Sequence, residues 1–217
     1  MRTTPSTRSG LYVILDPSVC PTRSLAEVLR DAAGAGVRIF QYRNKSASMK
    51  EAYAEASLLR TVAADLGVIF IVNDRCDLAL AVDADGVHLG QTDVPYGDAR
   101  DIMGPKKCIG LSTHNPEQVR TAERLQPDYI GFGPIYTPGS KQDHDPLVGI
   151  AGLTQIRALT TLPVFAIGGI TSENTKDVLK AGADGVAVIS AVLNAPDVRT
   201  TVSDFLRLFP APAASDS

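Results

Sequence analysis

The feature that most constrains this chain is a repeated alternation of short β-branched runs with stretches of helical spacing, punctuated by Gly, Pro or Asn. The runs predict strands, and the stretches between them predict helices. The runs fall at Leu11–Leu15, Val37–Tyr42, Val68–Val72, Gly86–His88, Cys108–Leu111, Tyr129–Phe132, Val164–Ile167 and Gly185–Ile189. Because strands that alternate with helices belong to parallel sheets, the pattern predicts an α/β fold.

Local signals mark where several of the helices begin and end. Ser48-Met49-Lys50-Glu51 fits a capping box, in which the serine hydroxyl and the glutamate carboxylate each bond an otherwise unpaired backbone N–H. Asn115-Pro116 predicts an N-cap followed by proline at the first helical position. Gly36 and Gly182 stand where a helix must stop before the next strand begins.

About eight βα units fit either a (β/α)8 barrel or a doubly wound open sheet. A dinucleotide-binding open sheet needs a GxGxxG turn after its first strand, but Leu15–Cys20 contains no glycine, so the barrel is favoured. Since no long linker or shift in composition interrupts the chain, we expect one domain over residues 10–209. The polar ends, residues 1–9 and 210–217, are expected to be disordered.

Composition excludes several classes of protein. With 44% hydrophobic and 21% charged residues, the chain has the balance of a globular protein with a sizeable core. A net charge of -3 provides no positive field for nucleic acid, so any anionic substrate must be met by local cations. The cysteines, Cys20, Cys76 and Cys108, form no CxxC pair, which argues against a disulfide framework and a zinc site.

We expect no secretory signal peptide and no membrane span in this sequence. Its first ten residues, MRTTPSTRSG, lack the apolar stretch of a signal peptide, and no later apolar run is long enough to span a bilayer. We therefore expect a cytoplasmic protein without a membrane partner.

In a (β/α)8 barrel, reactive side chains follow the carboxyl ends of the strands. After the second predicted strand, Gln41, Arg43 and Lys45 alternate and share one face of an extended segment. An arginine and a lysine on one face suit a diphosphate, because the arginine donates bidentate hydrogen bonds and the lysine adds a point charge. A solvated strand end is the structural alternative.

Acidic residues follow the third and fourth predicted strands. Asp74 comes directly after Asn73, and Asp93 closes the segment Gly90-Gln91-Thr92-Asp93. Carboxylates at neighbouring strand ends can share one Mg²⁺, a hard ion that takes oxygen ligands and keeps water and substrate phosphate in its shell. Taken singly, Asp74 fits a helix N-cap and Asp93 an exposed turn. Their combination with nearby cations favours a metal site.

The last four strands lead into segments suited to substrate binding. Ser112-Thr113-His114 offers two hydroxyls and an imidazole, which could also be capping groups. The loop Gly133–Lys141 is glycine-containing and ends in a cation, as in a lid over a phosphorylated ligand, or in an ordinary surface loop. Gly168-Gly169 and Ile189-Ser190 follow the seventh and eighth strands, where barrels of this kind commonly bind phosphate through backbone N–H groups.

Together these segments resemble the thiamine phosphate synthase family. The resemblance covers nearly the whole chain and is carried, in the family's order, by Phe40–Lys45, Val72–Arg75, Gly86–Asp93, Gly110–His114, Gly131–Tyr136 and Ala166–Ile170. It implies a TIM barrel that joins hydroxymethylpyrimidine diphosphate to a (carboxy)methylthiazole ethyl phosphate, with Mg²⁺, giving thiamine phosphate and pyrophosphate.

The resemblance also implies roles for individual residues. It assigns the pyrimidine diphosphate to Gln41, Tyr42, Arg43, Asn44, Lys45, Asn73, Ser112 and Lys141. It assigns the thiazole phosphate to Thr137, Gly139, Ser140, Gly169, Ile189 and Ser190. Asp74 and Asp93 would ligate Mg²⁺. The catalytic residues would be Arg43, Lys45, Ser112 and Lys141.

One position departs from the family pattern. The family often has Pro-Thr-x-Thr-Lys at the end of this loop, whereas this chain has Thr137-Pro138-Gly139-Ser140-Lys141. Ser140 supplies a hydroxyl, but Pro138 has neither a hydroxyl nor an N–H to offer the thiazole phosphate.

The residue types suit a dissociative substitution, in which diphosphate leaves an electron-rich aminopyrimidine and the thiazole nitrogen captures the resulting carbocation. No protein nucleophile is required, so the site must neutralise the diphosphate and exclude water. We predict that Lys141→Ala or Asp74→Ala lowers kcat by about 100-fold or more.

Other functions are compatible with the same barrel. A thiazole tautomerase or a non-catalytic phosphate-binding relative would share the phosphate site, and His114 leaves proton transfer open. The joint presence of Lys45, Asp74, Asp93 and Lys141 favours the synthase. A Schiff-base aldolase is disfavoured, because its lysine would be expected inside a strand in a desolvated pocket. The sequence leaves a homo-oligomer open.

Overall fold

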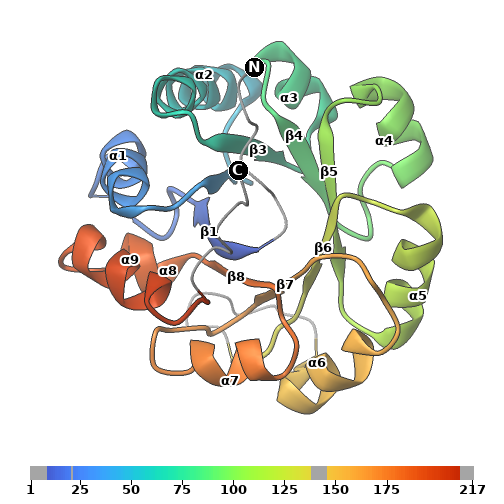
Figure 1. The fold of residues 1–217 in the computed structure, drawn as a ribbon. Coiled ribbons are helices and arrows are strands. Elements are labelled where there is room, and N and C mark those ends of the chain that lie inside the picture. The colour runs from blue at the N-terminus through green and yellow to red at the C-terminus, as the bar shows by residue number, and fades with distance from the viewer. Residues whose placement is uncertain (1–8, 21, 138–145, 211–217) are drawn as a thin grey trace, which may run out of the picture.

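The chain folds into a closed eight-stranded parallel barrel in this computed structural model, which describes residues 9–20, 22–137 and 146–210. Neighbouring strands are hydrogen-bonded in chain order, and the first pairs with the last (Figure 1). The strands are β1 (Gly10–Leu15), β2 (Ile39–Tyr42), β3 (Ile69–Asn73), β4 (Gly86–Leu89), β5 (Cys108–Thr113), β6 (Tyr129–Phe132), β7 (Val164–Ile167) and β8 (Gly185–Val188). The predicted (β/α)8 barrel is confirmed.

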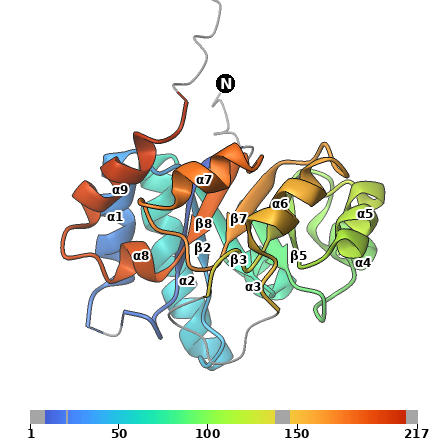
Figure 2. The same ribbon diagram turned by 90° about the horizontal axis from the view of Figure 1, so that it is seen from below.

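A ring of helices surrounds the barrel. These are α1 (Leu25–Ala35), α2 (Met49–Leu66), α3 (Cys76–Ala81), α4 (Tyr96–Met103), α5 (Pro116–Leu125), α6 (Gly149–Arg157), α7 (Thr175–Lys180), α8 (Ser190–Leu193) and α9 (Val198–Leu206). Figure 2 shows α9 and α8 beside α1 on one flank, and α4 and α5 on the opposite flank. The first and last helices therefore meet where the barrel closes.

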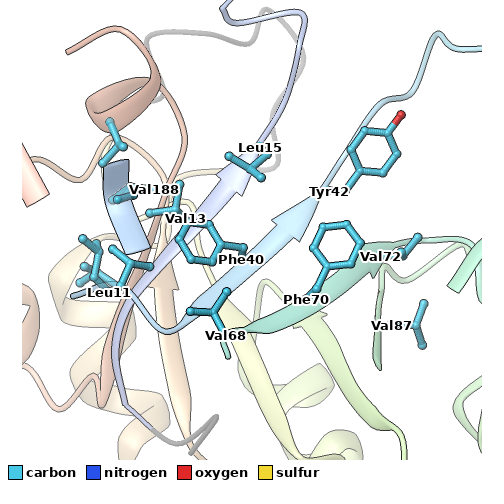
Figure 3. Close-up of a cluster of buried hydrophobic side chains, with 14 of the residues drawn as sticks. Leu11, Val13, Leu15, Phe40, Tyr42, Val68, Phe70, Val72, Val87 and Val188 are labelled. Carbon is cyan, nitrogen blue, oxygen red and sulfur yellow. The ribbon is translucent and has the colours of Figure 1, made fainter. Parts of the chain in front are cut away.

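The period-2 alternation of each strand divides the core into two layers. In β1, Leu11, Val13 and Leu15 point outward and pack beneath the helices (Figure 3), whereas Tyr12 and Ile14 point into the barrel. The interior layer consists of Tyr12, Ile14, Ile39, Ile69, Ile71, Tyr129, Phe165 and Ala187. Because three of these side chains are large aromatics, the middle of the barrel is a packed floor and not a channel.

The predicted caps are present. Ser48 accepts a bond from the Glu51 N–H and the Glu51 carboxylate accepts one from the Ser48 N–H, at 3.4 and 2.9 Å. Asn115 caps α5 by accepting from the Gln118 N–H, and Pro116 occupies the first turn.

The second strand begins later than the hydrophobic run predicts. Val37 donates its N–H to Ala32 O at 3.0 Å, which closes the last turn of α1, so the strand begins at Ile39. Val68 closes α2 in the same way by bonding Ala63 O. An apolar residue just before a strand can therefore belong to the cap of the preceding helix.

The cysteines form no disulfide: Cys20 and Cys76 are buried and Cys108 is partly exposed. In the described part of the chain, no helix has both the length and the apolar character needed to cross a bilayer.

Candidate active site

A cavity of about 230 Å³ opens at the carboxyl ends of the strands. It brings together eight of the residues to which the resemblance assigns a role: Gln41, Arg43, Lys45, Asn73, Asp74, Asp93, Ser112 and Ile189. They come from the ends of β2, β3 and β5 and from the segments that follow β2, β3, β4 and β8. The predicted alternation of Gln41, Arg43 and Lys45 places all three side chains in one cavity.

Arg43 is held by a carboxylate that the sequence did not reveal. Asp16 follows β1, its side chain is 3% exposed, and it forms an ion pair with Arg43 Nη1. Asp16 also accepts hydrogen bonds from the Ser18 N–H and hydroxyl, at 3.0 and 2.6 Å. A guanidinium carries five N–H groups, so Arg43 can bond Asp16 and still donate to a ligand.

Two carboxylates and a lysine meet at the mouth of the cavity. Lys45 Nζ lies 3.3 Å from Asp74 Oδ2, and the Gly90 N–H donates to Asp93 Oδ2 at 2.6 Å. Asp74 has a left-handed backbone, with φ 62°. Burial raises the pKa of Asp93, and the neighbouring Asp74 carboxylate adds to the rise because two like charges oppose each other. A cation placed between them would relieve that repulsion.

The floor of the cavity is a hydrogen-bonded row of neutral side chains. Ser112 Oγ lies 3.0 Å from His88 Nε2, and His88 Nδ1 lies 3.0 Å from the Tyr129 hydroxyl. Tyr129 and Tyr12 are 2.9 Å apart through their hydroxyls, and Gln41 Nε2 donates to Tyr12 at 2.7 Å. Burial lowers the pKa of His88 to about 4, so the imidazole is uncharged at neutral pH. The sequence singled out only the two ends of this row.

His114 also lines the cavity. Its Nδ1 lies 2.7 Å from Gly133 O, and because a carbonyl oxygen only accepts, Nδ1 carries the proton of that bond. Its backbone N–H bonds the Gln118 side chain at 2.7 Å. The carbonyl that follows β6 thus fixes the ring, and Gln118 in the first turn of α5 fixes the His114 backbone.

Tyr42 and Asn44 lie away from the cavity. Tyr42 points into the layer between barrel and helices (Figure 3), where its hydroxyl donates to Glu55 of α2 at 2.6 Å. Asn44 donates to the same carboxylate at 3.0 Å and accepts from the Ala47 N–H. Strand alternation explains the difference, because Tyr42 and Asn44 have the opposite parity to Gln41 and Arg43. Their side chains do not support the predicted contact with the pyrimidine diphosphate.

The turn after β7 is made of tightly packed backbone, and Thr137, Gly169 and Ser190 are not among the residues that line the cavity. Gly168 and Gly169 have φ 100° and 61°, and a Cβ on Gly169 would lie 2.8 Å from Thr137 O. The Tyr136 N–H bonds Gly168 O at 3.0 Å, which fixes the turn after β7 against the segment after β6. Thr137 is exposed, and Ser190 begins the short helix α8.

Part of the predicted site lies outside the described residues, namely Pro138, Gly139, Ser140 and Lys141. Within the described ranges, no cluster of three or more His, Cys, Asp or Glu side chains forms a metal site. The two carboxylates Asp74 and Asp93 therefore leave most of a cation's coordination positions to substrate and water.

His88, Tyr12 and Tyr129 share a signal that sequence reasoning did not use. Each stands at an inward-facing position of its strand, where a polar atom must find a partner inside the barrel. Asp16 carried a weaker signal, as a single acid one residue beyond the first strand.

Comparison with known proteins gives a consistent result. Residues 11–192 match the family model described as "Thiamine monophosphate synthase". A thiamine-phosphate synthase from Syntrophomonas wolfei is 44% identical over 189 residues, which cover 87% of this chain and 90% of the relative. One from Chloroflexus aurantiacus is 46% identical over 188 residues, 87% of each chain.

Solved structures agree with the sequence relatives. The thiamine phosphate pyrophosphorylase of Pyrococcus furiosus superposes with a TM-score of 0.83 at 38% identity, covering 93% of this chain and 95% of that one. An orotidine 5'-phosphate decarboxylase from Pyrococcus horikoshii superposes at 0.67 with 15% identity, which shows a shared barrel fold alone. From the match of sequence and fold over nearly its whole length, this chain belongs to the thiamine monophosphate synthase family.

Proposed function

We propose that this protein joins hydroxymethylpyrimidine diphosphate to a thiazole phosphate by dissociative substitution, releasing pyrophosphate and forming thiamine phosphate. One observation carries the proposal: cations and paired carboxylates surround the mouth of a cavity whose floor is neutral and aromatic. A leaving diphosphate needs the charged mouth, and a carbocation needs the neutral, aromatic floor.

The leaving diphosphate is bound by Arg43 and Lys45. Asp16 fixes the guanidinium in advance, so little reorganisation is needed as negative charge develops on the departing oxygen. Lys45 is 61% exposed and reaches over the mouth of the cavity from the loop after β2. Lys141, outside the described residues, is proposed to add a third positive charge.

Asp74 and Asp93 fit a magnesium ion. Both supply hard oxygen ligands, and the raised pKa of Asp93 reflects burial beside a like charge that a divalent cation would neutralise. When bound, Mg²⁺ would stabilise the negative charge of the leaving diphosphate. The Gly90 N–H holds Asp93 in place for this role.

The reaction breaks the bond between the pyrimidine methylene carbon and the diphosphate oxygen, and the oxygen keeps the electron pair. The carbocation left on the methylene is stabilised by the aminopyrimidine ring, then captured by the lone pair of the thiazole nitrogen. The site's own task is to hold both substrates close and exclude water. Ile14, Ile167 and Ile189 give the cavity apolar walls. A neutral His88 places no opposing charge beneath the cation.

The thiazole phosphate is proposed to bind on the β7–β8 side. Gly169, Ile189 and Ser190 are proposed to donate backbone N–H groups to it, as is usual where these barrels bind phosphate. Thr137, Gly139 and Ser140 are also proposed to bind the thiazole phosphate, the last two from outside the described residues.

The test is a product assay on the purified protein with both substrates and Mg²⁺. We expect thiamine phosphate and pyrophosphate in equal amounts, and no product with EDTA. A folded protein that leaves both substrates intact would contradict the proposal. A pyrimidine with electron-withdrawing fluorine on its ring methyl should react much more slowly, because it destabilises the carbocation; an unchanged rate would contradict the dissociative step.

A further inference from the structure

Five side chains form a continuous hydrogen-bonded row across the barrel, from Gln41 on β2 to Ser112 on β5. The contacts run from Gln41 to Tyr12 at 2.7 Å, Tyr12 to Tyr129 at 2.9 Å, Tyr129 to His88 at 3.0 Å and His88 to Ser112 at 3.0 Å. The row connects two residues that border the cavity at separate strand ends.

The side chains of this row are buried, and the packing of the barrel interior leaves space for them. Tyr12 and Tyr129 are fully buried and His88 is 9% exposed. Gly110 on β5 faces the same space, and a Cβ there would lie 2.2 Å from the Tyr129 ring and 2.6 Å from His88 Nδ1. Tyr129 stacks on His88 with ring centroids 5.4 Å apart. Only glycine at position 110 leaves room for both rings.

The direction of the hydrogen bonds follows from the end at Gln41. Its amide nitrogen can only donate, so the Tyr12 oxygen accepts. The Tyr12 proton then goes to Tyr129, the only other hydroxyl partner Tyr12 has among the described residues. The reverse direction would leave the buried Tyr12 proton without an acceptor in the described part of the chain, which costs about 1–3 kcal/mol.

The same reasoning continues to the other end. Tyr129, having accepted from Tyr12, donates its own proton to His88 Nδ1. A neutral imidazole with an accepting Nδ1 carries its proton on Nε2, so His88 donates to Ser112 Oγ. The Ser112 proton is then directed away from His88, into the cavity. At the opposite end Gln41 keeps its carbonyl oxygen for a ligand.

We infer that Tyr12, Tyr129 and His88 are positioning residues that select an aminopyrimidine over an oxopyrimidine by fixing the hydrogen-bonding character of Gln41 and Ser112. The inference rests on the proposed binding of the pyrimidine in this cavity. An aminopyrimidine offers N–H groups to the Gln41 carbonyl and a ring nitrogen lone pair to the Ser112 hydroxyl. The oxo form offers the reverse pattern, a carbonyl and a ring N–H. With the oxo form bound, its carbonyl would face the Gln41 carbonyl and its ring N–H would face the Ser112 hydroxyl proton.

The test compares two unreactive ligands of the same size, the aminopyrimidine monophosphate and its oxo counterpart, by isothermal titration. We expect the wild-type protein to prefer the amino form by about 100-fold or more. In Tyr129→Phe, the Tyr12 proton loses its acceptor, so the Gln41 amide turns to accept it and presents N–H to the cavity. The preference should then fall by about tenfold or more.

The ratio of the two affinities separates positioning from structure, because general damage weakens both ligands alike. Tyr96→Phe is the matched control: it removes a hydroxyl that bonds Gln126 O outside the barrel, and should leave the ratio unchanged. If Tyr129→Phe does not fold, Tyr12→Phe frees the Gln41 amide directly and should lower the ratio too.

An unchanged ratio in a folded Tyr129→Phe or Tyr12→Phe protein would overturn the inference. A wild-type protein that binds neither ligand would overturn the proposed pyrimidine site, and the inference with it. A wild-type protein that binds both ligands equally would overturn the inference alone.

Discussion

The two sides of the site differ in what forms them, because one is made of side chains and the other of backbone. From β1 to β5 the cavity is bordered by charged and polar side chains, and several of them are fixed by a partner, such as Arg43 by Asp16 and Asp93 by the Gly90 N–H. On the β7–β8 side the turn at Gly168 and Gly169 is set by backbone, and neither residue has a side chain to offer. We call these the side-chain half and the backbone half.

This difference determines how each half responds to a substitution. In the side-chain half a substitution can remove one charge and leave the backbone in place. In the backbone half any added atom moves the chain itself, since a Cβ at Gly168 would clash with Pro134 and a Cβ at Gly169 would clash with Tyr136 and Thr137. The two halves should therefore respond separately to mutation and to pH.

The largest expected effect is the loss of a charge from the side-chain half. Asp74→Asn keeps the size of the side chain, and asparagine tolerates the left-handed backbone at this position, where φ is 62°. We expect kcat to fall by about 100-fold, or about 2.7 kcal/mol, because a ligand for Mg²⁺ is lost. Steady-state kinetics over a magnesium titration measures this, and near-normal turnover would remove Asp74 from the metal site.

The next prediction concerns the support beneath Arg43. Asp16→Asn places an amide where the guanidinium has a buried carboxylate partner, so Arg43 loses its fixed orientation. We expect kcat/KM for the pyrimidine diphosphate to fall by about 30-fold and the melting temperature to drop, as is common when a buried ion pair is broken. If only stability changes, Asp16 serves the fold and not the substrate.

The free energy of unfolding should also depend on pH, through His88 in the side-chain half. The folded pKa of His88 is about 4 and its ordinary value is 6.5, so between these values the unfolded chain binds more protons. This contribution to stability is complete above pH 6.5 and is lost as pH falls toward 4. At pH 5 the loss is about 2 kcal/mol.

Denaturant unfolding at pH 5 and pH 7.5 measures this loss, with His88→Gln as the control. The variant lacks the titrating imidazole, so its stability should change less with pH than that of the wild-type protein. Equal pH dependence of the two proteins would show that His88 is not buried in its neutral form.

The smallest expected effect lies in the backbone half. Gly169→Ala introduces a Cβ 2.8 Å from Thr137 O at φ 61°, which shifts the turn. We expect KM for the thiazole phosphate to rise by about tenfold, with KM for the pyrimidine diphosphate little changed. Gly67→Ala is the control, because Gly67 has φ 66° at the end of α2 and nothing within 4 Å of an added Cβ. It carries the same backbone strain without the clash.

The same comparison explains what the sequence could predict. Alternating Gln41, Arg43 and Lys45 could be assigned to one cavity, because strand parity is a local property that holds in the folded chain. The resemblance extends to Tyr42 and Asn44 because the family segment is contiguous, but parity turns both side chains toward Glu55.

Asp16 and the interior residues of the hydrogen-bonded row could not be predicted from the sequence, for a physical reason. Asp16 and Arg43 are 27 positions apart, and their ion pair exists only because β1 and β2 are neighbours in register. The row from Gln41 to Ser112 likewise joins residues of five strands through the barrel interior. Contacts of this kind depend on which strands lie side by side and face one another across the barrel, which local periodicity does not specify.

The central claim is that the two halves bind different substrates, and one set of titrations tests it directly. Pyrophosphate with Mg²⁺ and thiazole phosphate are each titrated into the wild-type protein, Asp74→Asn and Gly169→Ala. We predict that Asp74→Asn loses affinity for pyrophosphate and keeps it for thiazole phosphate, and that Gly169→Ala does the reverse. If either variant weakens both ligands equally, the two halves are not separate sites and the account is wrong.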